Sequence, residues 1–438
     1  MLEINLSADD LVRALLGLSK HEPVYILDSS GVGHLGSHLL IAGLRPVEVF
    51  EVLNDDPEIT LRFLDDKLST DLAAIFTLSY DFGAKIQNTH RRTPSHETSE
   101  PDVFISLLDA LIVHDYASGK TVVVGDEGRR KEIAALISAS VDSPVGPEPA
   151  PRKSPGVVRS NFTKPEYIEA VETIQELIRR GDTYQTNLTQ RLDCDLPSAE
   201  TEQEIFWRLR RDNPAPFAAF LIREASTVIS ASPERFFHVM HGGSIEASPI
   251  KGTRRRGKSI EEDAELRAEL LASEKDRAEN TMIVDLVRND LGRVCEYGSV
   301  KVDQLCELEE HPTLFHLVST VSGKLRDDTK FTNILRATFP CGSITGAPKI
   351  STMKIIDALE PEPRGLSMGA IGFRLPPTWD LQEIALESEF DLSVAIRTMV
   401  IHGRNATFNV GGGIVIDSLP QDEYDESLLK AKALLRSI

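Results

Sequence analysis

Hydrophobic and polar positions after residue 160 predict a helix followed by a strand. The helix is expected to begin at Thr163, which has capping-box spacing to Glu166, and to end at Gly181. Its apolar positions recur at helical spacing: Tyr167, Val171, Ile174 and Ile178. The next run, 184–192, alternates as a strand does. One face carries Tyr184, Thr186, Leu188 and Leu192, and the other carries Gln185, Asn187, Thr189 and Arg191.

Further along, strand-like runs occur at 217–223, 226–230 and 235–240. A long helical pair is expected from Ser259 to about Leu291, and a glycine-rich strand end at 411–416. Strands mixed with helices, many at hairpin spacing, favour an α+β fold over a regular βαβ repeat. The stretch 139–165 is rich in Pro, Ser and Gly and reads as a connector. It separates an N-terminal region, 1–150, from a larger C-terminal region, 160–438.

Composition changes this picture little but excludes some functions. Hydrophobic residues make up 41% and charged residues 26% of the 438 positions, as in ordinary soluble proteins. A net charge of −20 argues against nucleic acid as a partner. No apolar run is long enough to span a bilayer, and the N-terminus lacks signal-peptide character, so a cytoplasmic, non-membrane protein is expected. The four cysteines show no metal-binding spacing and are expected to be reduced: Cys194, Cys295, Cys306 and Cys341.

Two glycine-rich segments resemble nucleotide-binding motifs but lack their context. Gly31–Gly36 matches GxGxxG, yet three residues separate it from the preceding strand and no βαβ unit follows, which favours a loop. Gly342–Lys349 lacks the contiguous Gly-Lys-Ser/Thr of a P-loop, so ATP binding is not expected. This second segment remains a candidate anion-binding turn before a helix that starts near Lys349.

Two carboxylate pairs are candidate metal ligands. Asp276 and Glu279 share a helix face, as do Glu423 and Glu426. Brought together, the pairs would form an all-oxygen site suited to Mg²⁺. The absence of His from both pairs argues against zinc. Solvated surface carboxylates are the alternative interpretation.

Three further candidates are charged residues in unusual settings. Lys251 precedes Arg254, Arg255 and Arg256, and neighbouring cations favour a neutral, nucleophilic amine; a solvated basic turn is the alternative. Glu234 lies at the mouth of an apolar strand, where burial would suit it to proton donation, unless it pairs with Arg235 or Arg223. Arg397 is a lone cation in an apolar run and needs an anionic partner. His316, between Phe315 and Leu317, reads by default as a core histidine.

Taken together, these segments resemble the chorismate-utilising enzymes, which include anthranilate, aminodeoxychorismate, isochorismate and salicylate synthases. The matching motifs are Pro249–Arg254, Glu274–Asn280, Asp285–Arg293, Phe339–Lys349, Ala395–Thr398 and Gly411–Ile414. Looser matches at 78–82, 101–104 and 113–116 extend the resemblance over nearly the whole chain. The resemblance implies two large, mostly antiparallel sheets packed as a sandwich with helices outside. It also implies that the N-terminal region is anthranilate-synthase-like and that 160–438 binds chorismate.

Within the family, lysine at position 251 resembles component I of the aminodeoxychorismate synthases, whereas anthranilate synthases carry alanine there. Gln185 stands where the water-adding members hold a lysine base, which disfavours water as the nucleophile. The implied product is 4-amino-4-deoxychorismate, on the route to 4-aminobenzoate and folate. The chain has no Gly-x-Cys-x-Gly nucleophile elbow, so ammonia is expected from a separate glutamine amidotransferase subunit (component II) in a heterodimer.

The resemblance also implies a role for each site residue. Mg²⁺ would be held by Glu279 and Glu426, supported by Asp276 and Glu423, and would bind the ring carboxylate. Glu234 would protonate the departing C4 hydroxyl, while Lys251 would add at C2 and later be expelled by ammonia. The remaining substrate-binding positions are Gln185, Gly252, Thr253, His316, Thr345, Arg397, Gly411, Gly412 and Gly413.

The chain departs from the family pattern at three places. Arg255 replaces a usual proline, and Ser367 stands where relatives often carry tyrosine. The tryptophan-binding signature of feedback-inhibited relatives is not clear, with 28–30 as its nearest counterpart, so tryptophan inhibition is not predicted. Two alternatives stay open: an anthranilate synthase component I, and a non-catalytic metal-binding interaction subunit.

Overall fold

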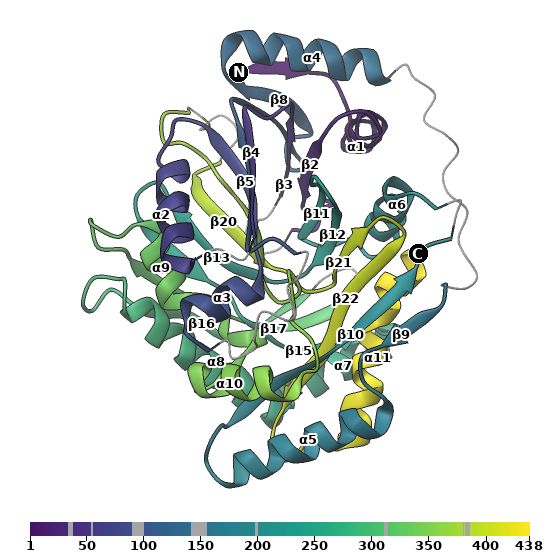
Figure 1. The fold of residues 1–438 in the computed structure, drawn as a ribbon, viewed down its shortest axis with the longest axis vertical. Helices are drawn as coiled ribbons and strands as arrows, with labels where there is room; N and C mark the ends of the chain where they lie inside the picture. The colour runs from purple at the N-terminus through teal and green to yellow at the C-terminus, as the bar shows by residue number, and fades with distance from the viewer. Residues whose placement is uncertain are drawn as a thin grey trace.

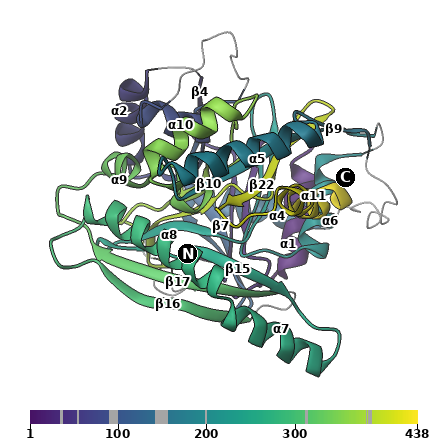
Figure 2. The same ribbon diagram turned by 90° about the horizontal axis from the view of Figure 1, so that it is seen from below.

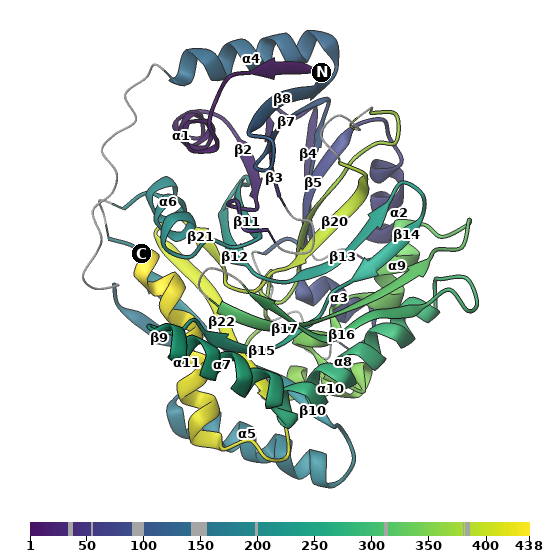
Figure 3. The same cartoon turned by 180° about the vertical axis from the view of Figure 1, so that it is seen from behind.

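The computed structural model describes residues 1–33, 38–53, 56–89, 100–141, 156–197, 200–310, 314–379, 381 and 386–438. Its core is a pair of sheets of twelve and ten strands, in which the described strand pairs run antiparallel (Figure 1). Helices cover the outer faces, as the view from behind also shows (Figure 3). The predicted α+β sandwich is confirmed.

The larger sheet joins a block of N-terminal strands to a block of later strands. N-terminal β2 pairs with β11, and β11 leads through β12 and β21 to β22 and β10. In spatial order its strands are β1 (Leu2–Ile4), β8 (Lys120–Gly125), β7 (Ala110–Asp115), β3 (Leu39–Leu44), β2 (Val24–Asp28), β11 (Phe217–Ile222), β12 (Thr227–Ser232), β21 (Thr398–His402), β22 (Asn405–Ile414), β10 (Gln185–Asp195) and β18 (Gly346–Ala347), with β9 (Val158–Ser160) beside β10.

The smaller sheet also joins strands from both ends of the chain, because N-terminal β5 pairs with C-terminal β19. Its order is β15 (Ile250–Arg255), β17 (Leu314–Lys324), β14 (Ser244–Ala247), β13 (Arg235–Met240), β20 (Ser388–Val394), β19 (Ala370–Arg374), β5 (Ala73–Leu78), β6 (Val103–Leu108) and β4 (Glu48–Val52), with β16 (Lys301–Glu310) beside β17. Strands from before and after the predicted connector therefore share both sheets. The region boundaries themselves stay a prediction; α4 ends at Val141, and 142–155 lie outside the described residues.

Several helices begin at local sequence signals. Thr163 and Thr201 each form a capping box at the start of α5 and α6. The described helices are α1 (Ala8–Leu18), α2 (Pro57–Leu68), α3 (Tyr80–Ile86), α4 (Glu127–Val141), α5 (Lys164–Arg179), α6 (Glu202–Asp212), α7 (Ile260–Ala272), α8 (Glu274–Gly292), α9 (Phe331–Thr338), α10 (Lys349–Leu359) and α11 (Pro420–Ser437). The predicted helix after Thr163, the strand after Tyr184 and the helical pair after Ser259 are thereby confirmed.

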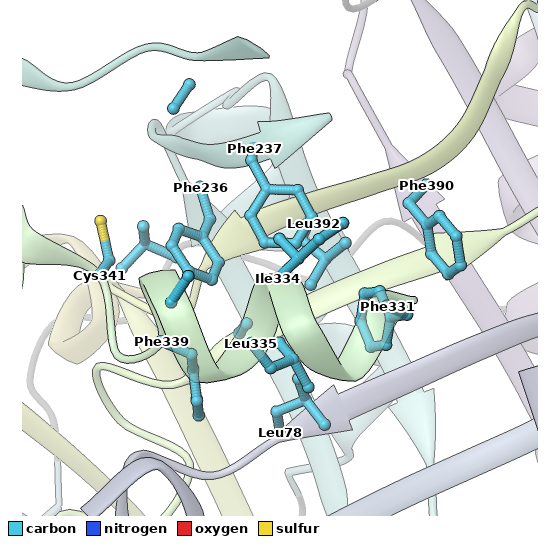
Figure 4. Packing of buried hydrophobic residues seen from close by; sticks show 14 of the residues in the cluster. Leu78, Phe236, Phe237, Phe331, Ile334, Leu335, Phe339, Cys341, Phe390 and Leu392 are labelled. Carbon is cyan, nitrogen blue, oxygen red and sulfur yellow. The ribbon is translucent and has the colours of Figure 1, made fainter. Parts of the chain in front are cut away.

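Three large hydrophobic clusters hold these layers together. One fills the space between the sheets, with Tyr25, Phe104 and Leu221 among its members. A second packs α1, α4, α6 and α11 onto the larger sheet, and a third packs α2, α8 and α9 onto the smaller one. In the third, Phe331, Ile334 and Leu335 of α9 lie among aromatic and aliphatic side chains of neighbouring strands (Figure 4). Burial of this apolar area is the main force that fixes the sheets.

Both glycine-rich segments occupy settings unlike nucleotide sites. β2 runs into an antiparallel partner, β3, so the GxGxxG match is not in a βαβ unit; residues 34–37 of that match lie outside the described residues. In the other segment, the Lys349 Nζ atom is buried and lies 2.5 Å from Asp290 and 2.6 Å from the Thr338 carbonyl oxygen. Its ammonium is therefore used internally rather than for a phosphate. Among the described residues, no helix has the length and apolar character needed to cross a membrane.

Candidate active site

Lys251 projects from β15 toward a short turn, η2 (Gly342–Ile344). Its Nζ atom donates a hydrogen bond to the Ser343 carbonyl oxygen at 3.2 Å. The next residue, Gly252, has φ = +80°, and a Cβ atom built there would lie 2.9 Å from Asp276 Cβ. Glycine therefore allows β15 to approach α8 at this point, where the β15–β17 register also shifts. This close approach sets Lys251 beside the carboxylate-bearing face of α8.

The three arginines after Lys251 are engaged with acidic side chains of α7. The Nε atoms of Arg254 and Arg256 lie 2.8 Å from Glu269 and Asp263, and Arg255 pairs with Glu262. Each guanidinium therefore has a carboxylate to balance its charge. The prediction that these arginines activate Lys251 by repulsion is not supported. Figure 2 shows β15 and β17 with α7 and α8 along the same side of the molecule.

Glu234 lies in the turn between β12 and β13 and is 5% exposed. The arginines proposed as its alternative partners pair elsewhere, Arg235 with Asp391 and Arg223 with Glu100. Burial raises the pKa of the Glu234 carboxyl, and this is only partly opposed by the Ser343 hydroxyl, the Lys251 charge and the Ile250 N–H. Its Oε1 atom is buried and has no hydrogen-bond partner among the described residues. A protonated carboxyl with one free oxygen is suited to donate a proton.

The two predicted carboxylate pairs lie on α8 and α11, and Glu423 acts electrostatically on Glu279. Burial raises the pKa of Glu279, and the charges of Lys251, Asp276 and Glu423 also act on this group. Burial likewise raises the pKa of Glu423, whose Oε1 atom accepts a 2.6 Å hydrogen bond from Ser418. For Glu426, burial is outweighed by the ammonium of Lys430 at 2.8 Å, which lowers its pKa. The structure thus brings two carboxylate pairs that lie 147 positions apart in the sequence (276 to 423 and 279 to 426) into one electrostatic cluster.

The donor set fits a hard cation in chemistry, although its side chains point partly to other partners. Asp276 lies 3.3 Å from Arg254, and the charge of Lys275 acts on Glu279, Glu423 and Glu426. Among the described residues, no three His, Cys, Asp or Glu side chains are spaced as a metal-binding group. The donors are all carboxylate oxygens with lysines nearby, and oxygen ligands of this kind are the ones that Mg²⁺ prefers. The magnesium site stays a prediction.

The glycines of β22 line the site beside β10. A Cβ atom at Gly413 would lie 2.1 Å from the Gln185 side-chain nitrogen, and one at Gly412 would lie 3.3 Å from Glu423 Oε2. The Gly411 carbonyl oxygen accepts a 3.0 Å hydrogen bond from Lys430. The absence of side chains at these three glycines therefore leaves room for Gln185 and α11 beside β22.

Three other predicted residues flank this edge or the adjoining strands. The Thr345 carbonyl oxygen accepts a 2.8 Å hydrogen bond from the N–H of Asn187, which lies two residues after Gln185 on β10. Thr253 Oγ1 and His316 Nδ1 lie 2.9 Å apart, so the histidine is buried and satisfied, as its default interpretation holds. These contacts join Thr345 to β10 and pair Thr253 with His316 across β15 and β17.

Arg397 lies between β20 and β21, and its guanidinium is buried. It has φ = +48°, and burial lowers the pKa of its guanidinium. Within the described part of the chain, its side chain forms no ion pair or hydrogen bond. A desolvated guanidinium without a protein carboxylate is suited to an anionic ligand.

Sequence reasoning missed a buried ion pair that supports the site. Arg364 and Glu360 are almost fully buried, with guanidinium–carboxylate distances of 2.9 and 2.7 Å. Arg364 also donates to the Ile344 and Asn187 carbonyl oxygens at 3.0 and 2.6 Å, which ties the η2 turn to β10. Charged residues at i and i+4 on a helix end ordinarily suggest surface, so no local signal identified this role.

A separate cavity of about 110 Å³ lies between the sheets near Asp28 and Ser29. It contains none of the predicted catalytic residues. Asp28 is already bonded to the Tyr116 hydroxyl at 2.7 Å and to Arg210 at 2.6 Å. The catalytic prediction therefore concerns the carboxylate cluster rather than this cavity.

The structure thus defines a class of protein in which a pair of antiparallel sheets holds a lysine near carboxylates of two helices. Comparison with known proteins makes the class specific: residues 33–436 match the chorismate binding enzyme family. This chain belongs to that family.

The most similar relatives include aminodeoxychorismate synthases. One, from Streptomyces griseus, is 41% identical over 352 residues, covering 78% of this chain and 47% of its own length. The aminodeoxychorismate synthase component 1 of Bacillus subtilis (strain 168) is 36% identical over 374 residues, covering 83% of this chain and 76% of its own. The chain thus spans about half the length of the first relative.

A solved structure extends the likeness to a second activity within the family. The anthranilate synthase component I of Streptococcus pneumoniae TIGR4 superposes with a TM-score of 0.78 at 29% identity. The superposition covers 92% of this chain and 93% of the other. The fold is therefore shared by family members that differ in product.

Proposed function

We propose that this chain is the chorismate-aminating component of an aminodeoxychorismate synthase. The reaction would convert chorismate and ammonia into 4-amino-4-deoxychorismate and water. The observation that carries the proposal is the position of Lys251, whose charge acts on Glu234, Glu279 and Glu426 from three different elements. Several relatives with the corresponding name support the same assignment.

In this proposal the Lys251 amine bonds to C2 of chorismate while the ring double bonds shift and the C4–O bond breaks. Glu234 gives its proton to the departing hydroxyl, which leaves as water. Ammonia then bonds to C4, the double bonds shift back, and the C2–N bond to Lys251 breaks. The proton released from the attacking ammonia restores the Glu234 carboxyl, so the cycle balances.

The carboxylates of α8 and α11 would hold Mg²⁺, with Glu279 and Glu426 as principal ligands and Asp276 and Glu423 in support. The ion would supply charge neutralisation for the ring carboxylate of the substrate. Arg397 and the N–H of Gly413 would bind the enolpyruvyl carboxylate. Gln185, with neutral amide chemistry, would orient ammonia without acting as a base.

Ammonia would come from a glutamine amidotransferase subunit. The component 1 names of several relatives support this division of labour.

The decisive experiment incubates the purified chain with chorismate, Mg²⁺ and ammonium, then adds an aminodeoxychorismate lyase. We expect 4-aminobenzoate, which should be lost in Lys251→Ala and retained in a control, Lys258→Ala, at an exposed position nearby. Absence of 4-aminobenzoate from the wild-type chain would refute the proposal. Chelation of the metal with EDTA should stop the reaction, and excess Mg²⁺ should restore it.

Anthranilate synthesis is the second candidate, because the superposed Streptococcus pneumoniae structure is an anthranilate synthase component I. The same incubation distinguishes the two, since anthranilate fluoresces and forms without a lyase. No product of either kind, with chorismate still bound, would favour a non-catalytic subunit.

A further inference from the structure

Ser343 lies between the predicted proton donor and the predicted nucleophile. It is the central residue of the η2 turn and is 4% exposed. Its carbonyl oxygen accepts the 3.2 Å hydrogen bond from Lys251 Nζ. Its hydroxyl is a hydrogen-bonding neighbour of the Glu234 carboxyl and lies 3.3 Å from Cys341 Sγ. One residue thus contacts groups from the β12–β13 turn and from β15.

We propose that Ser343 is a positioning residue that orients the Glu234 carboxyl through its hydroxyl and holds the Lys251 amine through its carbonyl. The inference rests on the proposed function, because it assigns Glu234 and Lys251 their catalytic roles. It adds a residue for which neither composition nor spacing gave a signal.

The arrangement around Glu234 explains what the hydroxyl does. A carboxyl group rotates freely about its last bond unless one oxygen is fixed. The Ser343 hydroxyl and the Ile250 N–H bind the carboxyl, while Oε1 keeps no partner among the described residues. Ser343 therefore restrains the rotation of the Glu234 carboxyl while Oε1 stays without a partner among the described residues.

The turn that carries Ser343 is held on every side. Thr345 Oγ1 donates to the Cys341 carbonyl oxygen at 3.0 Å, and Arg364 donates to that of Ile344 at the same distance. Before the turn, Phe339 and Cys341 belong to the hydrophobic cluster that surrounds α9 (Figure 4). A fixed turn can impose an orientation on its neighbours, whereas a flexible one cannot.

Gly342 makes this placement possible. A Cβ atom at that position would lie 2.6 Å from Leu286 Cδ2, so the turn presses directly against α8. The helix that bears Glu279 and the turn that bears Ser343 are therefore in contact. Because Ser343 contacts both Lys251 and Glu234, the turn holds these two residues near α8, the helix that carries Glu279.

The test compares Ser343→Ala with Ser343→Thr, which keeps the hydroxyl, and with Ser437→Ala as a control. Ser437 is buried at the end of α11 and bonds only the Leu434 carbonyl oxygen among its recorded side-chain contacts. With chorismate, Mg²⁺ and ammonium, we expect Ser343→Ala to lower kcat about 10- to 100-fold at nearly unchanged KM, the usual effect of losing a supporting hydrogen bond. Ser343→Thr and Ser437→Ala should retain most of the rate.

The pH profile separates positioning from simple structural damage. The Ser343 hydroxyl lowers the pKa of Glu234, so its removal should raise that pKa and move the alkaline limb of kcat to higher pH. The other ionisable groups facing Glu234 are Lys251 and Cys341, which are unchanged in the variant. A Ser343→Ala enzyme with wild-type kcat and pH profile would overturn this inference alone. A wild-type chain that forms no product would overturn it together with the proposed function.

Discussion

Replacement of Arg364 by methionine should strongly destabilise the protein. Methionine keeps the length and apolar volume of the side chain but leaves the Glu360 carboxylate without its cation in a buried setting. Removing one member of a buried ion pair typically costs about 3–5 kcal/mol. The Ile344 and Asn187 carbonyl oxygens lose a donor at the same time, so we expect the upper part of that range. This is a large share of a total stability of about 5–15 kcal/mol.

The chain contains a matched control. Arg159 and Asp195 form an ion pair through two hydrogen bonds of 2.7 Å, but both side chains are about half exposed. Because exposed pairs contribute about 0–1 kcal/mol, Arg159→Met should have little effect. Urea unfolding followed by tryptophan fluorescence would give the free energy of unfolding of each variant.

A double variant isolates the cause. Glu360→Gln removes the charge that Arg364→Met leaves uncompensated, while its amide oxygen can still accept from the Thr189 N–H and hydroxyl at about the present distances of 2.8 and 2.9 Å. The double variant should therefore be more stable than Arg364→Met alone. The reasoning is refuted if Arg364→Met costs no more than Arg159→Met, or if the second substitution deepens the loss.

Three further predictions concern the site itself. Glu234→Gln should reduce kcat by about 10²–10⁴-fold, as expected for loss of a general acid. Burial raises the pKa of Glu234 in the wild type, so activity should fall as the pH rises through that pKa, which a pH–rate profile would show. Gly252→Ala should cost about 1–3 kcal/mol in urea unfolding, because φ = +80° is strained for alanine and its Cβ would press on Asp276; Gly119→Ala, at φ = +71° in open space, is the control for strain alone. Arg397→Met should leave the free energy of unfolding unchanged or raised, since no described residue neutralises this cation. It should raise KM for chorismate about 10- to 150-fold, because a charged hydrogen bond of about 1.5–3 kcal/mol is lost. An unchanged KM would exclude Arg397 from the substrate site.

Local signals in the sequence predicted the elements well. The capping box at Thr163, the alternation after Tyr184 and the helical pair after Ser259 each depend on neighbours within a few residues, and all three are present. The spacing of Asp276 with Glu279 also placed a carboxylate pair on one helix face. Capping, alternation and helical periodicity act over one or two turns of chain, which is why they can be read locally.

Contacts between distant segments were beyond such reasoning. The basic run after Lys251 suggested a cationic surrounding for the lysine, but α7 supplies a carboxylate to each arginine. Ser343 and Arg364 gave no signal either, because their roles depend on residues up to 177 positions away. Electrostatic effects depend on the nearest opposite charge in space, and a linear sequence does not contain that distance.

The pairing of early strands with late ones in both sheets has a consequence for synthesis of the chain. β5 completes its pairing only with β19, at Ala370–Arg374, and β2 needs β11, at Phe217–Ile222. During synthesis on the ribosome, the edges of β2 and β5 therefore stay unpaired until these later strands have emerged. Such late partners slow folding and leave an interval in which strand edges are open to aggregation. We therefore expect the yield of folded protein during translation to depend on protection of these strand edges until their late partners are made.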